Sequence, residues 1–226
     1  MDEVSIGAAL ERLDAWCSEG DREELLALRP PATEDDLDEL RRAIDPYEIP
    51  PELVALLRWH NGQERSRASR DLLPIAEGPL LGTSEAQDVN DFLRNKCEPW
   101  QWCPLWVPIL QERWSQVGVE VSTEGPGIII DASFPDPEVQ VLSSSLAALL
   151  HATADMAEAG VLFSDAVSGP EYRAWYAERK KMMEARSEQV GWSHWPFERI
   201  VPLDEQGTDW PPHWRAARGF GADDAD

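Results

Sequence analysis

The chain has 226 residues, of which 42% are hydrophobic, and this suits one domain, or one domain with an accessory segment, that needs no disulfide framework from its three cysteines. Its net charge of −23 argues against nucleic acid and anionic membranes as partners, because both bind basic surfaces. The sequence has no apolar run long enough for a membrane span and no basic secretory leader, so we expect a cytoplasmic protein.

The first part of the sequence predicts helices. Apolar residues at helical spacing indicate one helix over 4–16, and a short second helix is expected over 21–28 before a pair of prolines. A third helix is predicted over 33–44. Thr33 is placed to cap it by accepting a backbone N–H, and Asp36 completes a shortened capping box.

Two more helices follow before the pattern changes. One starts at Pro51, with Asn61-Gly62 expected as its left-handed C-terminal cap. His60 stands at this end, where its imidazole can meet free carbonyl groups. The other helix covers 84–96. Its predicted buried stripe consists of Ala86, Val89, Phe92 and Leu93.

Short β-branched segments follow the helices and predict strands over 105–110, 117–122 and 127–132. Tight connections between them favour antiparallel pairing. The run Ile128–Ile130 is continuous rather than alternating, so we expect a central strand that is covered on both faces. Pro104 and Pro108 restrict the first strand to an edge or to non-donating positions. A serine-capped helix is expected after the strands, over 143–156.

The composition shifts near residue 160, which suggests three parts. We expect a main domain over 1–159 and an extension over 160–218 that packs on it. The extension contains a long helix near 169–186 and an irregular, tryptophan-rich stretch, and 219–226 reads as a disordered tail. The fold class predicted is therefore α+β, with helices packed on a small antiparallel sheet and an additional C-terminal helix and irregular extension.

Signals of catalysis or metal binding are weak, and no catalytic, cofactor or metal residue is predicted. Five residues separate Cys97 from Cys103, and no second cysteine pair accompanies them, so we interpret them as reduced hydrophobic residues rather than zinc ligands. His151 and Asp155 have the spacing of a polar pair on one helix face. Asp131 ends the apolar isoleucine run. It could be catalytic there, but capping of the following turn is favoured.

Three motifs resemble the SUKH superfamily, which includes the Smi/Knr-type fungal cell-wall regulators and many bacterial immunity proteins. They are the PPAT element with its acidic turn in 28–36, the PPEL element in 49–53 and the helix ending in WHNG over 56–62. The resemblance covers about 4–158. It departs from the family at 111–116, where a polar segment replaces the usual glycine-rich turn.

The resemblance implies an α+β domain that acts by binding rather than as an enzyme, without cofactors. In bacteria it implies an immunity protein of a polymorphic toxin system that neutralises a cognate toxin domain. The acidic charge would suit a basic toxin, since complementary charge speeds encounter. The alternative is a non-catalytic adaptor or regulatory scaffold, like the fungal members. The sequence leaves the oligomeric state open.

The predicted partner-binding surface lies in an acidic block. Residues 101–165 contain nine acidic side chains and one basic side chain, Arg113. Two tryptophans at the start of this block, Trp100 just before it and Trp102 within it, are either buried under the C-terminal tryptophans, which we favour, or exposed as aromatic anchors. The predicted contact residues are Glu120, Glu124, Asp131, Asp136, Glu138, Trp100 and Trp102.

Overall fold

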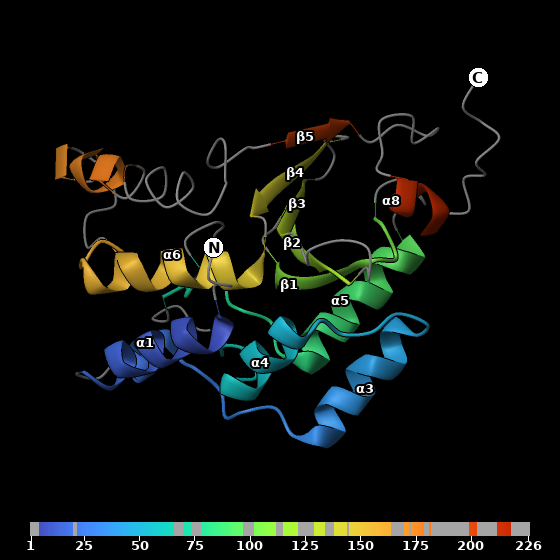
Figure 1. Ribbon diagram of the computed structural model, residues 1–226, viewed down its shortest axis with the longest axis horizontal. Helices are drawn as coiled ribbons and strands as arrows, with labels where there is room; N and C mark the ends of the chain where they lie inside the picture. Colours follow the sequence, from blue (N-terminus) through green and yellow to red (C-terminus); the bar gives the residue numbers. More distant parts are fainter. Residues whose placement is uncertain are drawn as a thin grey trace.

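A computed structural model gives an α+β fold, as the sequence predicts. Figure 1 shows an upright sheet with α6 on its left side, α8 on its right side, and the other labelled helices gathered below β1. Among the described residues, no helix is both long enough and apolar enough to cross a membrane. The structure describes residues 5–19, 22–65, 70–73, 78–96, 102–111, 115–121, 129–133, 138–143, 145–163, 170–171, 173–178, 181, 199–202 and 212–217.

The element bounds agree with most of the sequence-based expectations. The helices are α1 (Ile6–Ser18), α2 (Arg22–Leu26), α3 (Glu34–Ile44), α4 (Pro51–Trp59), α5 (Thr83–Lys96), α6 (Leu146–Glu158) and α8 (Pro212–Ala217). Residues 170–171, 173–178 and 181 are also helical, within the long helix predicted there. The strands are β1 (Trp106–Gln111), β2 (Ser115–Glu120), β3 (Ile129–Ser133), β4 (Glu138–Ser143) and β5 (Arg199–Pro202).

The start of α3 confirms the predicted capping box. The backbone N–H of Asp36 donates to the Thr33 hydroxyl at 3.2 Å, and the Thr33 N–H donates to the Asp36 carboxylate at 2.8 Å. The Thr33 hydroxyl also donates to this carboxylate, and these bonds lower the pKa of Asp36 below its ordinary value. Because both backbone groups find partners, the helix begins at a fixed residue.

The end of α4 differs from the predicted cap by two residues. His60, with extended backbone, is the C-cap, and its N–H donates to the Leu56 carbonyl at 3.0 Å. Its ring Nδ1 lies 2.6 Å from the carbonyl oxygen of Arg29, so the imidazole meets a carbonyl of another segment rather than of its own helix. Gly62 follows with φ of +82°, which favours glycine, and a Cβ there would lie 2.3 Å from the backbone nitrogen of Gly82.

Gln63 connects this turn to three other segments. It is buried, and its amide nitrogen donates to the carbonyls of Leu26 at 2.6 Å and Arg70 at 2.9 Å. Its amide oxygen accepts from the N–H groups of Leu72 at 3.2 Å and Leu80 at 3.0 Å. One side chain therefore satisfies four buried or partly buried backbone groups, which holds these connections together.

The five strands form one antiparallel sheet in the order β1-β2-β3-β4-β5. The central position of β3 confirms the interpretation of the isoleucine run, since Ile129 and Ile130 are both fully buried. The predicted edge position of Pro108 is also confirmed, because β1 is an edge strand. The outer side of β1 is partly covered, since Leu81 donates to the Ile109 carbonyl at 2.8 Å.

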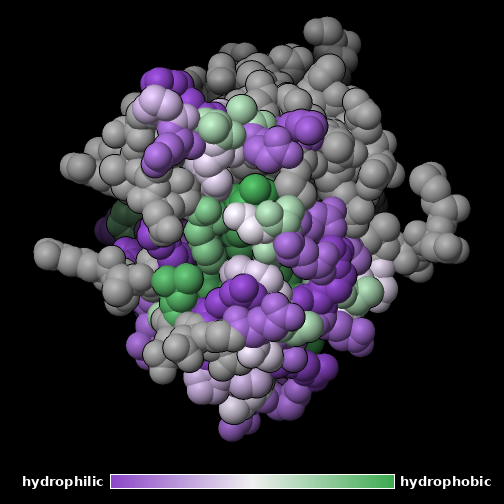
Figure 2. Space-filling model, turned by 90° about the vertical axis from the view of Figure 1, so that its left-hand side faces the viewer, coloured by the Kyte–Doolittle hydropathy of each residue, from purple (hydrophilic) through white to green (hydrophobic). Residues whose placement is uncertain are grey.

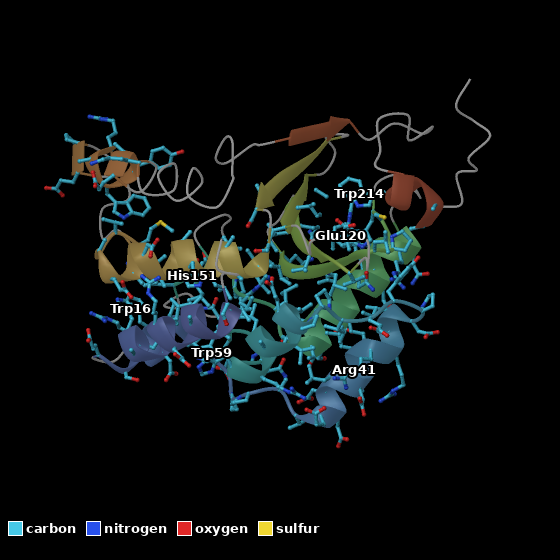
Figure 3. The ribbon with its side chains drawn as sticks, in the orientation of Figure 1. Trp16, Arg41, Trp59, Glu120, His151 and Trp214 are labelled. Atoms are coloured by element: carbon cyan, nitrogen blue, oxygen red, sulfur yellow. The ribbon has the colours of Figure 1, made fainter. Side chains whose placement is uncertain are left out.

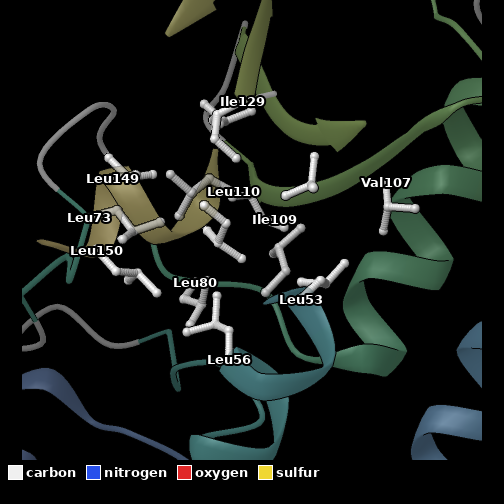
Figure 4. Close-up of a cluster of buried hydrophobic side chains, with 14 of the residues drawn as sticks. Leu53, Leu56, Leu73, Leu80, Val107, Ile109, Leu110, Ile129, Leu149 and Leu150 are labelled. Carbon is white, nitrogen blue, oxygen red and sulfur yellow. The ribbon is translucent and has the colours of Figure 1, made fainter. Parts of the chain in front are cut away.

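The main hydrophobic core lies between the sheet and the helices. Figure 4 shows leucines of α4 and α6 facing side chains of β1 and β3. A β-bulge between Pro108 and Leu110 interrupts the regular register, and both Ile109 and Leu110 join this cluster. The labelled residues of the cluster are Leu53, Leu56, Leu73, Leu80, Val107, Ile109, Leu110, Ile129, Leu149 and Leu150.

The first helix is attached to α6 by an ionic cluster. Arg12 donates to Asp155 and to both carboxylate oxygens of Glu158, each at 2.7 Å. His151 Nδ1 lies 3.4 Å from an Arg12 nitrogen, and its Nε2 lies 3.1 Å from the Ser5 carbonyl oxygen. Both residues of the predicted polar pair on α6 therefore contact an arginine from a distant part of the chain.

The C-terminal segment contributes to the sheet and to the core. β5 pairs with β4 as the fifth strand, a strand that the sequence reading placed in an irregular stretch. Trp214 of α8 is 0% exposed and its ring contacts Trp106 edge to face, with centroids 4.9 Å apart. Trp106 in turn contacts Trp102, which is 3% exposed, so the favoured burial of Trp102 is confirmed.

Candidate interaction surface

Two adjacent helices present an acidic surface. α3 and α5 pack against each other, as Figure 1 shows at the lower right, and both direct carboxylates into solvent. We call these side chains the acidic helical face. Its members are Glu34, Asp35, Asp38 and Glu39 of α3 and Asp88 and Asp91 of α5.

The helical periodicity places these carboxylates outward. In α3 the apolar stripe of Leu37, Leu40 and Ile44 is buried, so the intervening positions face solvent. In α5 the buried side includes Val89 and Leu93, and Asp88 and Asp91 lie on the other side. The acidic face therefore follows directly from the way each helix buries its apolar stripe.

Only part of the negative charge on this face is compensated. Arg41 lies 2.5 Å from the Asp38 carboxylate, and Arg58 forms an ion pair with Glu34. Among the residues that the structure describes, no ion pair involves Asp35, Glu39, Asp88 or Asp91. The nearby Arg94 does not compensate them, because its guanidinium donates to the carbonyls of Ala43 and Pro104. Uncompensated carboxylates attract a cationic partner.

An exposed aromatic residue lies on the same side of α5. Phe92 is 57% exposed, so of Phe92 and Leu93, which the sequence reading placed together in the buried stripe, only Leu93 is buried. Leu93 takes the buried position instead, and Asp88 precedes Phe92 by one helical turn. A solvent-exposed phenylalanine beside carboxylates is a suitable anchor for a protein interface.

The structure removes two of the sequence-predicted contact residues from the surface. Glu120 is 0% exposed and Trp102 is 3% exposed, so neither can form part of an exposed acidic or aromatic surface. Three others, Trp100, Glu124 and Asp136, lie outside the described residues.

The last two predicted residues lie on neighbouring strands. Asp131 of β3 pairs with Gln140, and Glu138 of β4 pairs with Ser133, so their backbone positions are close. The side chains of Asp131 and Glu138 are outside the described part of the structure. The fold therefore brings these two positions together, whereas Glu120 is buried on β2.

A family comparison identifies the central part of the chain. Residues 31–151 match the family model described as SMI1 / KNR4 family (SUKH-1). The chain belongs to this family. The match starts in the PPAT element and ends in α6, so it contains the acidic helical face and β1 to β4 of the sheet. No curated protein matches the chain.

Two segments lie outside the matched SUKH-1 region. α1 precedes it and is attached through Arg12, and the segment with β5 and α8 follows it. Both segments contact the SUKH-1 region directly, through α6 at one end and through the sheet at the other. Any binding surface of the protein can therefore include residues outside the family region.

A second surface of the SUKH-1 protein is apolar. Figure 2 shows hydrophobic side chains gathered in the middle of the face at the α1 and α6 end, between hydrophilic areas. Trp16, labelled at the left end of the molecule in Figure 3, contacts Phe163 with ring centroids 5.9 Å apart, and the Arg22 guanidinium lies 4.6 Å from the Trp16 ring.

The described residues provide no arrangement for a metal ion. No group of three histidine, cysteine or acidic side chains is close enough to hold one within the part of the chain that the structure describes. Cys17 and Cys103 are buried cysteines, and Cys97 is outside the described residues. The burial of Cys103 agrees with its interpretation as a small hydrophobic residue.

Proposed function

We propose that this SUKH-1 protein is an immunity protein that binds a basic protein toxin and blocks it, without catalysing a reaction itself. The observation that supports this function best is the acidic helical face with Phe92 on α5. Family membership supports a binding role, and the net charge of −23 supports a basic partner. In this proposal the protein acts in the cytoplasm, where the toxin would otherwise reach its target.

The charge distribution gives the proposal a physical basis. Carboxylates such as Asp88 and Asp91 would steer a basic toxin toward α5, because attraction between opposite charges raises the association rate. Phe92 would then enter an apolar depression on the toxin and slow dissociation. Charge and an aromatic anchor thus contribute to different steps of binding.

The test uses the toxin encoded beside this protein. The two purified proteins are mixed, and association is measured by calorimetry and by inhibition of the toxin. We expect a dissociation constant well below micromolar, together with loss of toxin activity. Absence of binding at micromolar concentrations to any neighbouring toxin contradicts the proposal, and capture of several unrelated partners instead favours an adaptor.

The surface is tested with a pair of matched variants. Asp88→Lys combined with Asp91→Lys changes the charge on α5, and Glu11→Lys combined with Glu19→Lys makes the same net change on α1 and its C-cap residue, at the other end of the molecule. Slower association is expected mainly for the α5 variant. Equal rates for the two variants would exclude the acidic helical face as the contact surface.

A further inference from the structure

The sheet has a second covered face, away from the main core. In β1 and β2, Trp106 pairs with Glu120 and Pro108 with Gly118, and paired residues in an antiparallel sheet lie on the same face. Val107 and its paired residue on β2 lie between these two pairs, so their side chains point to the other face of the sheet. There Val107 joins the helical core (Figure 4). Trp106 and Glu120 therefore belong to the face turned toward α8.

A compact aromatic site occupies this second face. We call it the aromatic socket and define it by Trp102, Trp106, Gly118 and Glu120. The rings of Trp102 and Trp106 meet edge to face with centroids 5.4 Å apart. A Cβ on Gly118 would lie 3.2 Å from the Trp102 ring, so glycine gives this ring room to lie over β2.

Trp214 fills the aromatic socket. Its ring meets Trp106 at 4.9 Å with an interplanar angle of 83°, and both side chains are 0% exposed. Glu120, which pairs with Trp106 on this face and is labelled in Figure 3, is also fully buried. The indole, rather than the short helix around it, is the deeply buried part, since Ala216 of α8 is exposed.

The segment that carries Trp214 joins both edges of the sheet. β5 pairs with β4 at one edge, and Trp214 contacts β1 at the other. Crossing four strand spacings requires roughly 19 Å, and the nine residues 203–211 can span up to about 30 Å. A six-residue helix and a four-residue strand are too short to be stable alone, so their contacts with the sheet hold them in place.

The socket and its occupant come from different parts of the chain. All four socket residues lie inside the SUKH-1 match, whereas 199–217 lies beyond it. This resembles recognition of a peptide by strand addition, in which backbone pairing gives affinity and a side-chain pocket gives specificity. The geometry therefore has the features of a binding site with its ligand attached.

We propose that residues 199–217 are an intramolecular ligand of the SUKH-1 sheet. The site recognises a chain segment that adds a strand to β4 and then inserts a tryptophan beside Trp106. Attachment raises the effective concentration of the segment at the site, so it outcompetes a free copy of itself. Loss of Trp214 opens the socket to a segment added from outside.

The test uses full-length protein and a synthetic peptide of residues 199–217. The peptide carries a fluorescent label, and its binding is measured by anisotropy at tens of micromolar. We expect at least tenfold tighter binding to the Trp214→Ala chain than to the wild-type chain. A peptide with the same Trp214→Ala change should bind to neither chain. Tyr176→Ala removes an exposed aromatic residue elsewhere and should behave as wild type.

Equal binding to both chains, or binding that does not require the peptide tryptophan, overturns the proposal. Circular dichroism shows whether the Trp214→Ala chain is folded; if it is not, Trp214→Phe replaces it and should bind the peptide with intermediate affinity. Hydrogen exchange of the wild-type chain provides a further measurement. Amides of α8 should exchange faster than those of β2 and β3, and equal protection contradicts an attached ligand.

Discussion

Arg12 of α1 donates two hydrogen bonds to Glu158 at the end of α6, each 2.7 Å long, across 146 residues of sequence. The same guanidinium also contacts Asp155. One arginine therefore attaches α1, which lies outside the SUKH-1 match, to α6, the helix in which the match ends. Two parallel hydrogen bonds between ionised groups are stronger than a single exposed ion pair.

Replacing Arg12 by alanine should lower the free energy of unfolding by about 1–2 kcal/mol, an amount reduced by the partial exposure of the pair. Arg12→Lys keeps the charge but not the paired geometry and should recover only part of the loss. Urea unfolding measures both variants. If Arg12→Lys lowers the free energy of unfolding as little as a surface substitution such as Glu11→Gln does, the paired hydrogen bonds do not stabilise the fold.

The same contact predicts a pH dependence. The hydrogen bond from Arg12 is the largest cause that lowers the pKa of Glu158 below its ordinary value of 4.5. A carboxyl group with a lowered pKa stabilises the fold above its ordinary pKa, and this contribution disappears as the pH falls through the lowered value. The difference in unfolding free energy between wild type and Glu158→Gln should therefore be largest near pH 7 and decrease below pH 4.5. A difference that is constant down to pH 2–3 would exclude this linkage.

Two of the glycines with positive φ, Gly62 and Gly160, provide a matched pair. A Cβ at Gly62 would lie 2.3–2.8 Å from the backbone of Leu81 and Gly82, whereas a Cβ at Gly160 meets nothing within 4 Å. Gly160→Ala should cost about 1 kcal/mol, from the left-handed backbone alone. Gly62→Ala should cost about 3 kcal/mol or more, because backbone must also move. Thermal unfolding of both variants checks this order. Equal losses of stability would show that the short distance between residue 62 and the backbone of Leu81 and Gly82 does not affect the stability.

Gln63 should be intolerant of substitution. Gln63→Leu has a similar size but leaves the N–H groups of Leu72 and Leu80 and two carbonyls without this partner. Since each unsatisfied buried group costs about 1–3 kcal/mol, we expect a loss of at least 3 kcal/mol in urea unfolding. Asn95→Ala removes an exposed amide that donates to a carbonyl of its own helix and should cost far less. A small loss for Gln63→Leu would contradict its connecting role.

The salt dependence of the association rate distinguishes the acidic helical face from the contact surface predicted from the sequence. With the neighbouring toxin, reversal of Asp88 and Asp91 should slow association several-fold at low ionic strength and much less at high salt. Reversal of Glu124 and Asp136 tests the surface predicted from sequence. If only the second pair changes the association rate, the contact surface lies beside the sheet. Phe92→Ala should mainly raise the dissociation rate, by about tenfold.

Local patterns predicted the elements that depend on neighbouring residues. Thr33 and Asp36 contain the whole capping box within four residues, and the prolines and isoleucines of the strands carry their own conformational preferences. Phe92 was misplaced because Phe92 and Leu93 differ by only one helical step, and periodicity alone does not decide which one faces the core.

Long-range contacts explain the other differences. The burial of Glu120 follows from its position opposite Trp106, a ring that is covered by Trp214 more than 90 residues later. The strand β5 has only four residues and pairs because β4 offers an edge, so its own sequence carries little signal. The acidic helical face lies outside residues 101–165, where the contact surface was predicted because that block contains only one basic residue.

Trp214 follows β1 to β4 in the sequence, and this sets an order of events during synthesis. Translation adds about 5–20 residues per second, so β1 to β4 leave the ribosome several seconds before α8 exists. During that interval the nascent chain has Trp102 and Trp106 but not the ring that covers them. A chaperone that recognises exposed aromatic residues would therefore have a limited period in which to bind. That period ends when α8 docks and Trp214 covers the two rings.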